Sequence, residues 1–160
     1  MRNFSEKNYR PCVGIVLINN GSIFAGQRLD YKSNAWQMPQ GGIEENESPI
    51  RAAIRELKEE TGIKKKHVKI ILESENWINY DLPKELIPKL WNGKFVGQSQ
   101  KWFAMEFLGS DSDVNINTKN PEFYKWQWMT KNKLLESIVP FKKIVYESIL
   151  SQFSAKLNLK

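Results

Sequence analysis

The chain has 160 residues, of which 41% are hydrophobic, so it can bury a substantial core and is expected to form one domain over residues 1–160. No segment approaches the roughly 18 consecutive apolar residues of a membrane-spanning helix, and the start has no apolar run after its charges. A soluble, cytoplasmic protein without a membrane partner is therefore expected. The net charge of +6 favours polyanionic ligands, although lysines scattered over a solvated surface produce the same balance.

Two short apolar segments near the start predict a β-hairpin. Residues 13–18 (VGIVLI) are rich in β-branched side chains, residues 19–21 (NNG) are typical of a turn, and residues 22–28 (SIFAGQR) follow. Arg10 and Arg28 therefore stand at strand ends. There each guanidinium can reach a ligand or form a salt bridge at the rim of the sheet.

Ser48, Pro49 and Gly62 predict the limits of a helix of about three turns. Serine is a favoured N-cap, proline suits the first helical position, and glycine ends helices. Residues 36–42 (WQMPQGG), which lead toward this helix, contain a proline and two glycines and predict an irregular loop.

The predicted helix has one apolar and one acidic side. At about 100° per residue, Glu56, Glu59 and Glu60 fall within an arc of about 100°. Like charges three and four residues apart repel, so a cation is expected beside them. Carboxylates suit Mg²⁺ or Mn²⁺ in a phosphate site, and an exposed acidic helix face is the alternative. The apolar side comprises Ile50, Ala53, Ile54 and Leu57.

The preceding loop favours a built site over a plain acidic surface. Gly41 permits backbone conformations closed to other residues, and Glu47 lies within reach of Arg55, whose planar guanidinium can fix the loop to the helix. Residues 41–63 resemble the Nudix box, G-x5-E-x7-R-E-U-x-E-E-x-G-U, in which U is aliphatic. Every fixed or restricted position matches: Gly41, Glu47, Arg55, Glu56, Leu57, Glu59, Glu60, Gly62 and Ile63. The resemblance implies hydrolysis of a nucleoside diphosphate linked to another group.

The second half of the chain predicts two strands, at residues 68–75 and 101–108. Between them, residues 76–98 mix aromatic, proline and basic residues without a clean period and predict a long functional loop. Residues 114–120 also predict a loop. His67, after a basic run, is expected at the surface. Cys12 is the only cysteine of the sequence, so no intramolecular disulfide can form, and Cys12 is expected in the core.

Strand and helix patterns close the chain. Trp126 and Trp128 stand two residues apart and therefore on one strand face, where core packing is favoured over a base-stacking platform. Residues 131–139 predict a short helix ended by Pro140. A final amphipathic helix is predicted by Phe141, Ile144, Val145, Ile149 and Phe153. These elements predict a mixed α/β domain, and the resemblance implies the Nudix fold, an α/β/α sandwich with a mixed central sheet and a strand-loop-helix-loop catalytic unit.

A narrower resemblance covers nearly the whole chain. Six blocks in the same order resemble the bacterial RNA pyrophosphohydrolases, a branch also described as dinucleoside polyphosphate hydrolases: residues 9–17, 36–43, 76–84, 97–103, 121–128 and 140–146. This resemblance implies that Glu56, Glu59, Glu60 and Glu122 bind metal and that Arg10 and Arg28 contact phosphates. It further implies a substrate cleft lined by Gln40, Gly41, Tyr80, Gln98 and Lys101, with Phe141 and Lys142 holding the first bases of an RNA. For Phe141, packing in the core of the last helix is the alternative.

The chemistry also fits the residues themselves. Hydrolysis of a phosphoric anhydride needs an activated water and neutralised leaving phosphates, and divalent metal ions held by the glutamates would supply both. Glu59 could accept the proton, with Glu56 and Arg55 beside it, but metal ligand and base are not separable by sequence. Three interpretations stay open: an RNA pyrophosphohydrolase that leaves a 5'-monophosphate and promotes RNA decay, a dinucleoside polyphosphate hydrolase, and a non-catalytic phosphate- or RNA-binding module. Protein partners, the preferred base and the oligomeric state are not indicated.

Overall fold

A computed structural model describes residues 8–29 and 35–160. These residues form a mixed sheet whose strands follow the order β3-β2-β1-β7-β5, with β4, β6 and β8 paired to β1, β7 and β2. The strands are β1 (Tyr9–Asn19), β2 (Ser22–Arg28), β3 (Trp36–Gln37), β4 (Gln40–Gly42), β5 (Val68–Glu73), β6 (Ile78–Asp81), β7 (Gly97–Phe107) and β8 (Phe123–Met129). The helices are α1 (Pro49–Thr61), α2 (Lys131–Ser137) and α3 (Lys143–Ser154).

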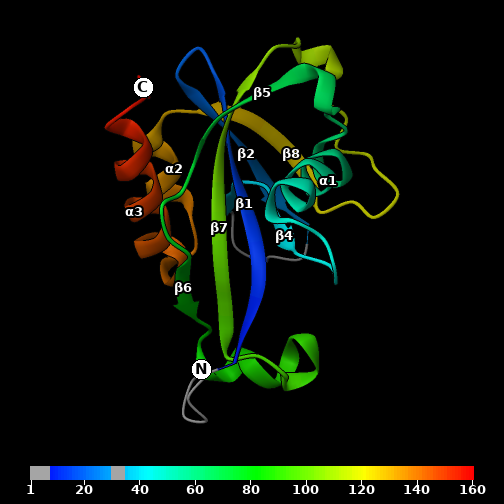
Figure 1. Cartoon of the computed structure of the whole chain (residues 1–160), viewed down its shortest axis with the longest axis vertical. Helices are drawn as coiled ribbons and strands as arrows, with labels where there is room; N and C mark the ends of the chain where they lie inside the picture. Colours follow the sequence, from blue (N-terminus) through cyan, green and yellow to red (C-terminus); the bar gives the residue numbers. More distant parts are fainter. Residues whose placement is uncertain (1–7, 30–34) are drawn as a thin grey trace.

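The helices cover both faces of the sheet, as the predicted sandwich requires (Figure 1). Alternate residues of β1 and β7 enter two different cores, because successive strand side chains point to opposite faces. Ile15 and Phe103 pack on the α1 side, whereas Val16 and Trp102 pack on the side of α2 and α3. The strands β1 and β7 run parallel along most of their length and form the centre of the sheet.

Helix α1 begins and ends where its sequence predicts. The Ser48 side chain accepts a hydrogen bond from the Arg51 N–H at 3.4 Å. Gly62 has φ 71°, in the left-handed region, and its N–H donates to the Lys58 carbonyl at 2.9 Å. The predicted hairpin is also present, with Asn20 and Gly21 in the turn between β1 and β2.

Two segments are more ordered than their composition predicts. Residues 36–42, expected as an irregular loop, contain β3 and β4, because β4 pairs antiparallel with β1 and places Gly41 opposite Val13. Residues 76–98, expected as one long loop, contain β6, two 3₁₀ turns at Lys84–Lys89 and Trp91–Gly93, and the start of β7. Pairing with strands distant in the chain supplied the order that local patterns lack.

The last helix differs from its prediction at its N-terminal end. Phe141 precedes α3 in a 3₁₀ turn, Pro140–Lys142, and Ile144 is 79% exposed rather than part of the buried stripe. That stripe comprises Val145, Tyr146, Ile149, Leu150 and Phe153. Across residues 8–29 and 35–160, no helix has the length and apolar character needed to cross a membrane.

Candidate active site

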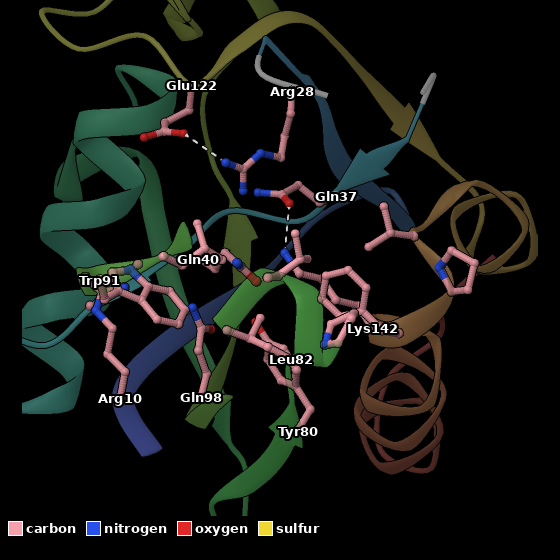
Figure 2. Close-up of a pocket in the computed structure, with 18 of the residues that line it drawn as sticks. Arg10, Arg28, Gln37, Gln40, Tyr80, Leu82, Trp91, Gln98, Glu122 and Lys142 are labelled. Atoms are coloured by element: carbon pink, nitrogen blue, oxygen red, sulfur yellow. Dashed lines mark hydrogen bonds and ion pairs between the residues drawn. The ribbon is translucent and has the colours of Figure 1, made fainter. Parts of the chain in front are cut away.

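A cavity of about 820 Å³ opens beside the box helix (Figure 2). Its walls come from β1, β2, β4, α1, β6, β7 and the segments before β7 and α3. Most of the site residues that the sequence singles out line this cavity: Arg10, Arg28, Gln40, Gly41, Glu56, Glu60, Tyr80, Gln98, Glu122, Phe141 and Lys142. Residues from both halves of the chain therefore share one space.

Arg55 joins the box loop to the box helix, as expected. Its Nε and Nη2 donate to the two carboxylate oxygens of Glu47 at 2.7 and 2.8 Å, and Nη2 also donates to the Gly42 carbonyl at 2.9 Å. The guanidinium hydrogen bonds lower the pKa of Glu47 to about 2 from an ordinary 4.5. Arg55 lies beneath the cavity wall rather than on it, where it holds the loop in place.

The same guanidinium reaches the acidic helix face. Arg55 Nη1 donates to Glu56 at 2.9 Å and to Glu59 at 3.2 Å. Glu59 is exposed, with 57% of its side chain accessible, and is not among the cavity-lining residues. Arg55 thus ties Glu59 to Glu56, which lines the cavity.

Two carboxylates of α1 are held away from water. Glu60 is 5% exposed and accepts a hydrogen bond from the Gln40 N–H at 3.4 Å. Burial raises the pKa of Glu60 well above its usual range, and the nearby charges of Glu56 and Glu122 raise it further. Burial likewise raises the pKa of Glu56. Buried carboxylates gathered in this way favour the approach of a cation.

The donor chemistry of this cluster fits a hard divalent cation. Its oxygen ligands are those that Mg²⁺ and Mn²⁺ prefer, and the buried Glu60 needs charge compensation. Within the described ranges, however, no three acidic, histidine or cysteine side chains come close enough to enclose an ion. Glu122, predicted as a distant ligand, instead lies 3.9 Å from Arg28 in an ion pair, the rim salt bridge that the sequence left open. The four-glutamate ligand set stays a prediction.

Basic groups line the cavity from other elements. The Arg10 guanidinium lies 4.9 Å from the centre of the Trp91 ring, and Gly42 lies so close that an added Cβ would overlap Arg10 Nη2. Lys142 is 5% exposed, and its Nζ donates to Gln37 at 3.1 Å. The cavity therefore presents guanidinium and ammonium groups together with carboxylates, a combination suited to a metal-bound phosphate chain.

Aromatic side chains occupy another part of the wall. Tyr80 and Phe141 lie with their ring centres 6.1 Å apart and their planes tilted by 36°. Phe141 is half-buried against the core and also faces the cavity, so both roles considered for it are compatible with its position. Trp126 and Trp128 pack around Phe24 in the α1-side core, as predicted.

Lys101 is not brought to the cavity. Its neighbours in β7, Gln100 and Trp102, face the cavity side of the sheet, so Lys101 faces the opposite side. There its Nζ lies 3.5 Å from the Glu75 carbonyl and 3.9 Å from Glu73. The assignment of Lys101 to the substrate cleft gains no support from this position.

Sequence reasoning missed two neighbours of the predicted site residues. Gln100 is 1% exposed and donates to both Gln40 and Gln98, and the β-alternation of GQSQKWF would have placed it on the face of Gln98. Trp91 covers Arg10 from a left-handed backbone position, φ 48°, which no pattern in the sequence indicates. Cys12 and His67 match expectation: Cys12 is fully buried, and His67 is partly exposed beside Asp113.

Comparison with known proteins identifies the family. The model of the NUDIX domain matches residues 8–149. An RNA pyrophosphohydrolase of Roseobacter denitrificans is 53% identical over 150 residues, which cover 93% of this chain and 94% of the relative. An RNA pyrophosphohydrolase of Rickettsia canadensis is 51% identical and covers 99% of this chain and 100% of its own length.

Solved structures share the fold at lower identity. The dihydroneopterin triphosphate pyrophosphohydrolase of E. coli superposes with a TM-score of 0.67 at 19% identity, covering 89% of this chain and 97% of its own. An Ap4A hydrolase of C. elegans superposes with a TM-score of 0.65 at 20% identity, covering 91% of this chain and 98% of its own. The intact box, the cavity beside it and these matches lead to one conclusion: the chain belongs to the Nudix family of hydrolases, which act on phosphoric anhydride bonds.

Proposed function

We propose that this protein is an RNA pyrophosphohydrolase that removes pyrophosphate from the 5'-triphosphate end of RNA, leaves a 5'-monophosphate and so promotes RNA decay. Relatives that bear this name align with more than nine-tenths of the chain at about half identity. The proposal includes one catalytic domain over residues 1–160 and a cytoplasmic location, where such an RNA substrate is expected.

One observation carries the proposal. A single cavity is lined by carboxylates suited to a cation, by guanidinium groups suited to phosphates, and by an aromatic pair suited to a base. A triphosphate attached to a nucleoside needs all three kinds of contact. Base stacking on an aromatic side chain is worth about 1–3 kcal/mol in proteins that bind single strands.

Each group has a role in the proposed reaction. Nudix hydrolases use divalent metals, and Mg²⁺ held by Glu56, Glu59, Glu60 and Glu122 would lower the pKa of a bound water and neutralise the leaving phosphates. Glu59 would accept the proton of the attacking water at a carboxylate oxygen, while Arg55 keeps that carboxylate beside Glu56.

The substrate is positioned by other groups. Arg10 and Arg28 would bind phosphate oxygens, and Arg28 would exchange its contact with Glu122 for one with substrate. Phe141 and Tyr80 would stack on a base, and Lys142 would contact the nucleotide beside it. Positioning and charge neutralisation account for most of the catalysis in phosphoryl transfer.

The test is hydrolysis of a short RNA with a labelled 5'-triphosphate, with Mg²⁺ and with chelator, resolving pyrophosphate from orthophosphate. Metal-dependent release of pyrophosphate that leaves a 5'-monophosphate is the expected result. Hydrolysis of a dinucleoside tetraphosphate in the same buffer tests the alternative interpretation, a dinucleoside polyphosphate hydrolase. Equal kcat/KM for the two substrates would contradict the RNA assignment, because only RNA can use sites for the second and third bases that follow the 5' nucleotide along the strand.

A further inference from the structure

Four side chains of β7 and β4 form a hydrogen-bonded chain on the cavity side of the sheet. The Trp102 indole N–H donates to Gln100 Oε1 at 3.2 Å. Gln100 Nε2 donates to Gln98 Oε1 at 2.8 Å and to Gln40 Oε1 at 3.3 Å. Gln40 and Gln98 line the cavity, whereas Gln100 and Trp102 lie behind them, 1% and 0% exposed.

The donor at the start of this chain determines the direction of every bond in it. An indole N–H donates and never accepts, so Trp102 selects the oxygen end of the Gln100 amide. The nitrogen end of Gln100 then has to meet acceptors, which are the oxygen ends of Gln98 and Gln40. The NH₂ groups of both glutamines are consequently turned away from Gln100.

Contacts with three other residues hold the Trp102 ring and backbone in place. Its ring makes an edge contact with Tyr146, with ring centres 5.7 Å apart, and its backbone N–H donates to Ser74 Oγ at 3.0 Å. The indole also lies against Gly14 of β1, where an added Cβ would stand 2.5 Å from the ring. The indole N–H therefore has a fixed position from which to orient Gln100.

The two NH₂ groups have no acceptor of their own. In residues 8–29 and 35–160, Nε2 of Gln40 and Nε2 of Gln98 make no hydrogen bond, although Gln98 is 95% buried and borders the cavity. An acceptor oxygen inside the cavity would give these two donors a partner. In the sheet register Gln98 stands between Arg10 of β1 and Tyr80 of β6, and all three are drawn around the cavity in Figure 2.

We propose that Gln100, held by Trp102, is a positioning residue that keeps the NH₂ groups of Gln40 and Gln98 directed into the cavity, where they donate hydrogen bonds to acceptor oxygens of the substrate. The identity of that ligand as substrate rests on the proposed function. The shared chemistry is an oxygen acceptor, either a non-bridging phosphate oxygen beside Arg10 or a base carbonyl beside Tyr80.

NMR of the unmodified protein tests this directly, since side-chain NH₂ groups give resolved signals. The protein without added metal is titrated with inorganic pyrophosphate and, separately, with a 5'-phosphorylated dinucleotide. We expect the Gln40 and Gln98 NH₂ signals to shift while the Gln100 NH₂ signal changes little. A response to pyrophosphate alone identifies a phosphate acceptor, and a response only to the dinucleotide identifies a base or sugar oxygen.

Two results would overturn the proposal. One is a shift of the Gly41 and Gly42 backbone signals without any shift of the Gln40 and Gln98 NH₂ signals, which would mean that ligand binds without these donors. The other is the absence of any shift in the cavity, which would also remove the cavity as the substrate site. Shifts in a protein that fails to hydrolyse triphosphorylated RNA would overturn the proposed function and leave the donor assignment standing.

A kinetic test separates positioning from stability. Gln100→Met keeps the volume but removes the amide oxygen and nitrogen, so we expect KM to rise about tenfold, the value of a lost hydrogen bond to a charged acceptor, with kcat within a factor of two. Gln127→Met, at a half-buried position of β8 outside the cavity, is the matched control and is expected to leave both constants unchanged. An unchanged KM in Gln100→Met would contradict the role of Gln100. If the variant is too unstable to measure, the NMR titration of the unmodified protein still decides whether the NH₂ groups of Gln40 and Gln98 donate to the ligand.

Discussion

The carboxyl group of Glu56 rests directly on the backbone of Gly41, with no room between them for a side chain. A Cβ added at Gly41 would overlap the carboxyl carbon of Glu56. The two residues are 15 positions apart in sequence, and the pairing of β4 with β1 brings the glycine to the helix face. The spacing of the box thus places the backbone of Gly41, which has no side chain, against the carboxylate of Glu56, which is proposed to bind metal.

Gly41→Ala is therefore expected to displace the Glu56 carboxylate. A shift of about 1 Å in a group that positions the reaction lowers kcat/KM by about 100-fold, with a smaller effect on stability. Steady-state kinetics and thermal unfolding measure the two effects. Gly109→Ala is the control, because the nearest atom there belongs to the Asp113 side chain, outside the cavity. Equal activities of the two variants would contradict a role for the close contact.

Glu59→Gln is expected to abolish turnover and leave the fold intact. Its side chain is exposed, and the amide oxygen can still accept from Arg55, so folding loses little. Loss of a general base lowers the rate by about 10²–10⁴-fold. Glu44→Gln is the matched control, since Glu44 is an exposed carboxylate 3.7 Å from the same guanidinium. Full activity in Glu59→Gln would remove this helix face from the catalytic site.

The ion pair of Glu47 with Arg55 is expected to make the unfolding free energy of the protein depend on pH in the acid range. Its pKa in the folded protein is about 2, below the ordinary 4.5, so its contribution is complete above pH 4.5 and disappears as pH falls toward 2. Glu47→Gln is expected to lose about 1–2 kcal/mol of unfolding free energy at pH 7, an amount moderated by solvent screening, and less at pH 3. Urea unfolding at pH 7, 5 and 3 measures this, with the exposed Glu45→Gln as control. A stability difference that stays constant with pH would contradict the ion pair as its cause.

Trp91 is expected to affect substrate binding through Arg10. Trp91→Leu removes the ring 4.9 Å from the guanidinium, and a lost cation–π contact at a partly exposed site raises KM by about two- to fivefold. Trp91→Phe should recover part of this loss, and kcat should stay unchanged in both. Trp77→Leu, an exposed tryptophan outside the cavity, is the control. A fall in kcat without a change in KM would show that Trp91 acts elsewhere.

Local signals in the sequence determined the box unit in detail. Ser48 and Gly62 limit α1 because N-caps and left-handed C-caps depend on a few adjacent residues. Glu47 meets Arg55 because the two stand only eight positions apart, across the start of the helix. The apolar run of residues 13–18 likewise predicted a buried strand, and the periodicity of α1 predicted the apolar side that packs on the sheet. These features are decided within one element or between neighbouring ones.

Tertiary structure alone decided which distant residues share the cavity. Gln100 meets Gln40 across 60 residues of sequence, and Arg28 meets Glu122, because the pairing of β1 with β4 and β7, and of β2 with β8, sets their register. The same register turns Lys101 to the far side of the sheet, and a one-residue difference in strand position is enough to make that change. The sequence therefore determined the chemistry available to the site, and the strand register determined which side chains take part in it.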